Sequence, residues 1–250
     1  MSLSAAEILR LAWPAALGGT AALAALAGGT FAPASSFWGP VVSRAKHASA
    51  GVALTFDDGP TPGATDRVLD TLADLRAKAA FFVVGRNALK HPELVSRMHT
   101  EGHVVGNHTL DHAHFGLIRR RRYWQHQIRE TDEIIRQIIG RRPALFRPPM
   151  GIKTLHTARA AAASGHVMVT WSRRALDGVA TSWERIVHRL GPTSEPGDVL
   201  LLHDGIEPHA RPRDPGATVA ALRPLVETLR SRGLEPRPLD ELLGLPAYQS

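Results

Sequence analysis

The chain of 250 residues contains no cysteine. This absence excludes disulfide bonds, thiolate metal sites and a cysteine nucleophile. Lysine is also scarce, so arginine supplies most of the basic charge in a chain whose formal net charge is +7. Such a surplus suits anionic partners such as phospholipid or nucleic acid, and it equally fits a general preference for arginine. Glycine and proline follow no repeat, which excludes collagen-like and low-complexity architectures.

The residues that are present are those of an ordinary globular protein. Hydrophobic residues make up 44% and charged residues 21% of the sequence, so a wholly disordered or fibrous chain is excluded. The length allows one large domain or two small ones. Thirteen histidines are many for this length and are the first indication of metal or acid–base chemistry.

The N-terminal region has no charged residue between Leu11 and Ser43. Within it, Leu11–Ala34 is mostly apolar and is long enough to cross a bilayer, which takes about 20 residues. Three interpretations are open: a single transmembrane anchor, a signal peptide cleaved at the small residues Ala32–Ala34, or a soluble helix packed on the domain. We therefore divide the chain into an anchor or signal segment with its linker, residues 1–48, and a globular domain, residues 49–250.

Beyond Ser49, short apolar runs alternate with amphipathic stretches. The expected strands are Val52–Phe56, Ala80–Val84, His103–Val105, Leu145–Phe146, Val167–Trp171 and Asp198–Leu202. The expected helices are Thr65–Lys78, Pro92–Glu101, Tyr123–Ile139, Thr154–Ser164, Trp183–Leu190 and Ala217–Arg232. This alternation is typical of parallel βαβ units. Six or seven units favour a barrel, and no second domain is evident.

Chemically capable side chains follow nearly every expected strand. In βα barrels the catalytic groups lie at the carboxyl ends of the strands, so these clusters would meet at one rim. The clusters are Asp57 and Asp58; Asn107, His108 and His112; Arg147; Trp171 with Asp177 downstream; and His203 with Asp204.

Paired carboxylates and paired histidines are the first two features of this rim. Asp57 and Asp58 point opposite ways on an extended chain, so one could bind a metal while the other acts as a base. The same residues would also make a simple turn. His108 and His112 are four apart, and two histidines with one carboxylate are a common ligand set for a metal with open positions. An incidental histidine pair is the alternative.

The remaining polar residues have roles that the spacing alone leaves open. His203 ends an apolar strand and is either structural or a general acid. Arg147 could hold a carboxylate ionised or could form a surface ion pair. We interpret His103 as a strand residue and His114 as peripheral to the histidine pair. We expect Arg119–Arg122 to form a solvated basic loop before a long helix, or else to contact an anionic group.

Four of these segments together resemble the motifs of the polysaccharide deacetylase family, also known as the NodB-homology family or carbohydrate esterase family 4. The resemblance covers about Val52 to Leu243. The segments are Thr55–Pro60 (TFDDGP), Gly106–His112 (GNHTLDH), Phe146–Gly151 (FRPPMG) and Leu201–Asp204 (LLHD), which resemble the first, second, third and fifth motifs. Four motifs in the family's order are a specific signal.

The resemblance implies a distorted (β/α)7 barrel of the NodB-homology type as a single catalytic domain. It implies one divalent metal ion held by Asp58, His108 and His112. Two histidines and one aspartate admit zinc, our first choice, or cobalt, nickel or manganese. Such a metal polarises an amide carbonyl and lowers the pKa of its water.

The resemblance also implies a role for each remaining residue. Asp57 would be the general base, held by Arg147, and His203 would be the general acid that protonates the leaving nitrogen. Leu201 would shape the pocket for the acyl methyl group. The backbone N–H of Met150 would help to stabilise the oxyanion.

The fourth motif is where this chain departs most from the family. The segment Trp171–Gly178 keeps Trp171 and Asp177, and Asp177 could tune His203. Arg174 stands where the family usually has an acid. Gly178 and Met150 each stand where the family usually has an aromatic residue.

These departures leave the implied catalytic set intact but change the substrate groove. An arginine-lined groove suits an anionic or phosphate-bearing saccharide better than a neutral polymer. We therefore expect Met150, Trp171, Leu201 and Arg174 to contact the substrate.

The function that follows is a metal-dependent hydrolase that removes an N-acyl group, usually acetyl, from an amino sugar. The substrate would be a cell-envelope polysaccharide, peptidoglycan or a lipid-linked saccharide, and no nucleic acid or obligate protein partner is expected. One alternative is a deformylase or another hydrolase of non-peptide amides. Another is a catalytically silent sugar-binding module, which the retention of the implied catalytic residues argues against.

For localisation we expect membrane association through Leu11–Ala34, as a single-pass protein with an extracytoplasmic catalytic domain. The flanking charges argue for the opposite side, because Arg44 and Lys46 follow the segment whereas Glu7 and Arg10 precede it. A cleaved signal peptide is the alternative to an anchor. A chain that begins at residue 49 is expected to be soluble and active.

Overall fold

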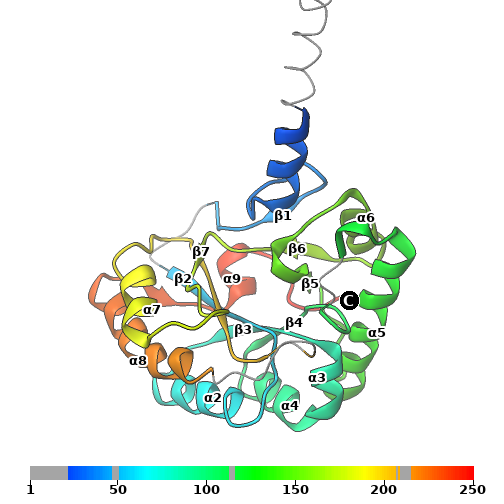
Figure 1. The fold of residues 1–250 in the computed structure, drawn as a ribbon. Coiled ribbons are helices and arrows are strands. Elements are labelled where there is room, and N and C mark those ends of the chain that lie inside the picture. Colours follow the sequence, from blue (N-terminus) through cyan, green and yellow to red (C-terminus); the bar gives the residue numbers. More distant parts are fainter. Residues whose placement is uncertain (1–21, 47–50, 113–115, 207, 209–214) are drawn as a thin grey trace, which may run out of the picture.

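The structure is a computed structural model, and it describes residues 22–46, 51–112, 116–206, 208 and 215–250. One parallel sheet lies at the centre and helices surround it (Figure 1). The strands are β1 (Val41–Val42), β2 (Gly51–Asp57), β3 (Ala79–Val83), β4 (Val104–Asn107), β5 (Leu145–Phe146), β6 (Val167–Val169), β7 (Arg173–Arg174), β8 (Val199–His203) and β9 (Glu235–Pro236). The helices are α2 (Thr65–Asp74), α3 (Gly85–Lys90), α4 (Pro92–Thr100), α5 (Arg121–Ile139), α6 (Leu155–Ala163), α7 (Trp183–Leu190), α8 (Gly216–Ser231) and α9 (Leu239–Leu243), with the 3-10 turns η1 (Gly116–Ile118) and η2 (Pro149–Gly151).

The strands pair in the order β1-β6-β5-β4-β3-β2-β8-β7, and β9 pairs with β2. Every one of these pairings is parallel, so the carboxyl ends of the strands share one rim. Within the described ranges β1 and β7 do not pair. Instead an isolated antiparallel bridge from Arg44 to Asp198 joins the chain after β1 to the chain before β8. The prediction of a distorted parallel βα barrel in a single domain is confirmed.

The side chains of β2 and β8 alternate between the helices outside the barrel and the interior of the barrel. Successive side chains of a strand point to opposite faces. One set packs against α2 and α8 on the outside: Val52, Leu54, Phe56, Leu200 and Leu202. The other set packs inside the barrel: Ala53, Val199 and Leu201. Thr55, Asp57 and His203 continue this inner set, which is why the ends of β2 and β8 aim polar groups into the barrel.

Most expected elements are present, with shifted ends. Helix α2 ends at Asp74 rather than Lys78, because Arg76 adopts a left-handed backbone with φ 50°. Strand β6 ends at Val169 rather than Trp171. The expectation of a loop at Arg119–Arg122 is wrong for its second half, since Arg121 and Arg122 form the first turn of α5. Arginine is a good helix former, and this explains the early start.

Five short elements, of two to six residues each, were not indicated by the sequence patterns. They are β1, β7, β9, α3 and α9. Strand β1 lies before residue 49, where we placed the start of the domain, and it pairs with β6 through Val41 and Val42. The sheet therefore includes residues that we assigned to the linker.

The end of the apolar N-terminal segment is attached to the domain. Residues 22–31 form a helix that points away from the barrel (Figure 1), and residues 32–34 follow it. The Nζ of Lys153 donates hydrogen bonds to the carbonyls of Ala32 and Pro33, at 2.9 and 3.1 Å. The hydroxyl of Thr170 donates to the same Pro33 carbonyl at 2.9 Å.

The interpretation of Leu11–Ala34 as a membrane anchor falls partly on residues 11–21, which lie outside the described residues. Among the residues that the structure does describe, no helix is both long enough and apolar enough to cross a bilayer.

Candidate functional site

The carboxyl ends of β2, β4, β5 and β8 bring the sequence-predicted residues together at one rim. Asp57 ends β2 and Asp58 follows it, while His108 follows β4. Arg147 follows β5 and His203 ends β8. All of these side chains are buried except that of His203, which is 19% exposed. The rim thus gathers charged and titratable groups whose side chains are mostly buried.

Asp58, His108 and His112 form one compact cluster. One ligand atom from each lies within 4.8 Å of the others. The Nε2 atoms of His108 and His112 are 3.6 and 3.4 Å from Asp58 Oδ1. The Nδ1 of His108 is 2.8 Å from the carbonyl of Arg147, a contact that fixes its ring and turns Nε2 to the cluster.

The electrostatics of this cluster keep its carboxylate ionised. Burial would raise the pKa of Asp58, but the hydrogen bond with His108 and the charge of His112 lower it well below its usual range. Two imidazole nitrogens and a carboxylate oxygen are a donor set that suits zinc and its neighbours among the divalent metals. The residues present therefore fit a divalent ion.

Asp57 is held by a buried arginine. The Nη1 of Arg147 donates to Asp57 Oδ1 at 2.7 Å and to the hydroxyl of Thr55 at 2.9 Å. The same guanidinium donates to the carbonyls of Val169 and Thr170. Burial lowers the pKa of Arg147, against the charge of Asp57, which raises it. The second oxygen of Asp57 lies 3.7 Å from His108 Nε2, so Asp57 borders the cluster of Asp58, His108 and His112.

His203 and Asp177 form a second acid–base pair on the same rim. The Nδ1 of His203 is 2.8 Å from Asp177 Oδ1, and its backbone N–H donates to Asp177 Oδ2 at 2.9 Å. The hydroxyl of Thr218 donates to the same Oδ2 at 2.7 Å. Burial alone would lower the pKa of His203, but the charge of Asp177 raises it to about 9. His203 is therefore protonated at neutral pH and can act as an acid.

The residues expected to contact substrate are divided between two environments. Met150 is 46% exposed and lies on η2 with a left-handed backbone, φ 55°. Met150, Trp171 and Arg174 line one pocket of about 510 Å³. Leu201 is buried inside the barrel and does not line that pocket.

Several residues that hold the site were not predicted from the sequence. Thr55 supports Arg147, and Thr218 supports Asp177. Asn107, which was noted only as part of a motif, accepts the backbone N–H of Thr109 through its side-chain oxygen at 2.8 Å and donates to Asp132 at 2.8 Å. Thr55 and Asp57 are two residues apart on β2, so their side chains point to the same side of the sheet. This spacing was the one sequence signal for any of these contacts.

The other two histidines near the pair have separate positions. The ring nitrogen of His103 accepts the backbone N–H of Ala79 at 3.2 Å, and burial lowers the pKa of His103 to about 4. His103 directly precedes β4, so its interpretation as a strand residue is wrong by one position, and its contact with Ala79 gives it a structural role. His114 lies outside the described residues.

Comparison with known proteins gives consistent matches. The family model for polysaccharide deacetylase matches residues 44–169. A peptidoglycan-N-acetylglucosamine deacetylase of Bacillus cereus is 35% identical over 182 residues, which is 73% of this chain but only 64% of that relative. A chitooligosaccharide deacetylase of Bradyrhizobium sp. is 36% identical over 198 residues, 76% of this chain and 90% of that relative. The crystal structure of a peptidoglycan N-acetylglucosamine deacetylase superposes with a TM-score of 0.77 at 30% identity, covering 84% of this chain and 95% of that one.

Proposed function

The chain belongs to the polysaccharide deacetylase family, and from its site we propose that it hydrolyses the N-acetyl amide of an amino sugar in a cell-envelope saccharide. One observation carries the proposal. The Asp57–Arg147 pair borders the cluster of Asp58, His108 and His112, and His203, paired with Asp177 at 2.8 Å, lies on the same rim. A base, a metal-type site and an acid on one rim are what amide hydrolysis requires.

The three-residue cluster would hold a divalent ion, and we propose zinc. When bound, such an ion supplies Lewis-acid polarisation of the amide carbonyl and a water of lowered pKa. Asp58, His108 and His112 provide three ligands, which leaves positions for water and substrate.

The side chains of this chain perform the proton transfers. Asp57 accepts a proton from the attacking water, and Arg147 keeps the carboxylate in position at 2.7 Å. The C–N bond breaks as His203 donates its proton to the leaving nitrogen. Asp177 holds the His203 ring through Nδ1 and stabilises its charged form. The products are acetate and a free amino sugar.

The backbone N–H of Met150 is our candidate for an oxyanion donor. Met150 lies on η2, three residues after Arg147 of the rim, and its left-handed backbone reorients that N–H relative to a regular turn. A positioned donor stabilises the developing oxyanion and commonly contributes about 10²–10³-fold to the rate.

The relatives' names concern peptidoglycan and chitooligosaccharides, both polymers or oligomers of N-acetylated sugars. We propose a substrate of that class that carries an anionic group or a lipid-linked phosphate. The exposed Arg174 on the pocket wall supports this choice. We further propose that the apolar N-terminal region associates with the membrane and presents the barrel on the outer side.

The experiment is a mass-spectrometric screen of cell-envelope extracts with the purified, zinc-loaded chain. We expect a saccharide to lose the mass of one acetyl group, with release of acetate. Chelation should abolish the loss and added metal should restore it. Asp57→Asn is the inactive control. Release of formate instead would identify a deformylase, and full activity in a preparation shown by elemental analysis to be metal-free would refute the mechanism.

A further inference from the structure

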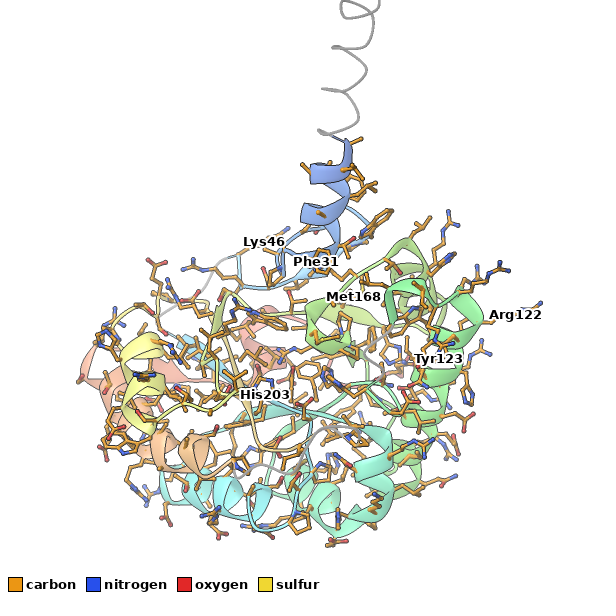
Figure 2. The ribbon with its side chains drawn as sticks, in the orientation of Figure 1. Phe31, Lys46, Arg122, Tyr123, Met168 and His203 are labelled. Atoms are coloured by element: carbon orange, nitrogen blue, oxygen red, sulfur yellow. The ribbon has the colours of Figure 1, made fainter. Side chains whose placement is uncertain are left out.

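The N-terminal segment contributes to a pocket beside the catalytic rim. Figure 2 shows Phe31 at the foot of the N-terminal helix, where that helix meets the barrel. Phe31 and Pro33 line the pocket of about 510 Å³ together with Met150, Trp171, Arg44 and Arg174. Parts of the chain far apart in sequence thus share one cavity: the N-terminal segment, the Met150 turn and strand β7.

Three hydrogen bonds and one packed ring make this pocket a built feature. Lys153 is fully buried, and its Nζ donates to Ala32 and Pro33 and also, at 3.1 Å, to the carbonyl of Gly151. One side chain therefore connects the N-terminal segment with the turn that carries Met150. Trp171 packs on Gly151, where a Cβ would come within 2.6 Å of the indole ring.

The pocket adjoins the catalytic residues through Trp171. The Arg147 guanidinium lies 5.8 Å from the Trp171 ring. Strand β7 carries Arg174, which is in register with Leu201, two residues before His203 on β8. A saccharide whose acetamido group reaches the rim can therefore place a neighbouring group in the pocket.

The positive charge of the pocket indicates which chemical class of neighbouring group it binds. Two arginines and, among the described residues, no acidic side chain line it. Arg44 is partly neutralised by Glu195, at 2.8 Å, and by Asp198, at 3.5 Å. Arg174 is exposed and has no ion pair with any carboxylate in the described part of the chain. A guanidinium with open donors beside apolar and aromatic walls binds an oxyanion carried on a sugar ring.

We infer that the N-terminal segment, residues 30–34, completes a subsite in which Arg174 and Arg44 bind a phosphate or carboxylate on the saccharide next to the acetylated sugar. This inference rests on the proposed function and deepens it. Phosphate would come from a lipid-linked or other sugar phosphate, and carboxylate from an acidic glycan. The subsite explains why Phe31 and Met150 remain exposed, at 55% and 46%, beside a charged rim.

The first test compares three acetylated oligosaccharides of equal length: a neutral one, one with a phosphate ester and one with a carboxylate. The zinc-loaded full chain is assayed for acetate release. We expect a lower KM for an anionic substrate, and the better of the two identifies the natural group. Arg174→Gln should raise that KM by about 10-fold, the loss of one charge-assisted hydrogen bond, and should raise the KM of the neutral substrate much less. Arg136→Gln, on the remote helix α5, removes the same charge and should change nothing.

The second test addresses the N-terminal segment itself. Phe31→Glu places a carboxylate in the pocket and should remove the preference for anionic substrates. Phe37→Glu is the matched control, because Phe37 is in the same region and 54% exposed but does not line the pocket. Equal effects of the two variants would refute a role for residues 30–34.

A third measurement separates failure of the subsite from failure of the proposed function. Binding of a sugar phosphate to the metal-free chain is followed by calorimetry in wild type and in Arg174→Gln. Weaker binding in the variant supports the subsite even if no substrate is deacetylated. Equal KM values for neutral and anionic substrates in wild type, or equal calorimetric binding in both proteins, would overturn the subsite and leave the deacetylase proposal standing.

Discussion

Asp57 and Asp58 are neighbours in the chain, yet each is held by different partners. Asp57 ends β2 and pairs with Arg147, whereas Asp58 adopts a left-handed backbone with φ 74° and faces the histidine pair. We expected them to point in opposite directions, as on an extended chain. The turn at Asp58 brings both to one side, so that His108 Nε2 lies 3.7 Å from Asp57 and 3.6 Å from Asp58.

Because the two carboxylates have different roles, the same Asp→Asn substitution should affect turnover at one position and metal binding at the other. Asp57→Asn should retain metal and lose turnover by about 10²–10⁴-fold, the contribution of a positioned general base. Asp58→Asn should lose metal, because a ligand is removed. Elemental analysis and acetate release measure the two effects. Loss of metal from Asp57→Asn alone would show that the roles are reversed.

The pair of His203 and Asp177 predicts the pH dependence. The pKa of His203 is raised from 6.5 to about 9, so its ion pair with Asp177 is fully present below about pH 6.5 and is lost as pH rises through about 9. The acid form is lost over the same range, and kcat should fall there. Asp177→Asn removes the largest of the charges that oppose the effect of burial and leaves those of Asp58 and Asp57, so this basic limb should move down by more than about one pH unit.

The measurement is kcat against pH for wild type and two variants. The loss in Asp177→Asn should be larger at about pH 7.5 than at about pH 6, because His203 is then largely neutral. Thr218→Val is the matched control, since it removes a hydrogen bond to Asp177 and leaves its charge in place. An unshifted basic limb in Asp177→Asn would exclude His203 as the acid.

At the scale of elements, α5 supports the loop that carries the histidine pair. Asp132 on α5 accepts hydrogen bonds from Asn107, at 2.8 Å, and lies 3.1 Å from Nε2 of His166. Asn107 in turn receives the backbone N–H of Thr109, beside His108. The network is buried, so a missing partner is costly.

Asp132→Ala should therefore lower both stability and metal affinity. We expect a loss of about 1–3 kcal/mol in the free energy of unfolding from buried groups left without a partner. Affinity for zinc should fall by about 10–100-fold, as is usual when a residue that orients the metal ligands is substituted. Denaturant unfolding and competition with a chelator measure these quantities. Glu133→Ala, one residue along with a side chain that is 39% exposed, is the control. Unchanged zinc affinity in Asp132→Ala would make the network purely structural.

Helices could be predicted from the sequence because their periodic burial is strong, and α7 has the predicted bounds. Strand β5 has only two residues, but both are apolar and buried, and its bounds were predicted too. Strands β1 and β7 could not be predicted, because their two residues are not buried and each strand is fixed by its partner in space. The role of Thr218 could not be predicted either, because its partner Asp177 is 41 residues away in the sequence. Local patterns carry no information about such pairings.

At the scale of the whole molecule, the N-terminal region and the barrel are connected at a seam. Strand β1 pairs with β6, and the Arg44–Asp198 bridge joins the following segment to the edge of β8. The indole N–H of Trp38 donates to Thr30 at 3.0 Å. A chain that begins at residue 49 lacks all of these contacts. We therefore no longer expect such a chain to be as stable and active as the full one.

The test of this connection is a thermodynamic cycle between the N-terminal segment and Lys153. A chain that begins at Ser35 lacks the Ala32 and Pro33 carbonyls and leaves the Lys153 ammonium with Gly151 as its remaining acceptor among the described residues. Burial already lowers the pKa of Lys153 to about 8, so an ammonium with fewer partners is strongly disfavoured there.

Lys153→Met should consequently have opposite effects in the two backgrounds. In the full chain it removes three hydrogen bonds and should destabilise the fold. In the chain that begins at Ser35 it removes a poorly partnered buried charge and should be neutral or stabilising. Urea unfolding of the four proteins, in the same non-ionic detergent, gives the coupling energy, which we expect at about 1–3 kcal/mol. Additive effects would mean that Lys153 does not tether the segment, and the N-terminal wall of the pocket would then need another support.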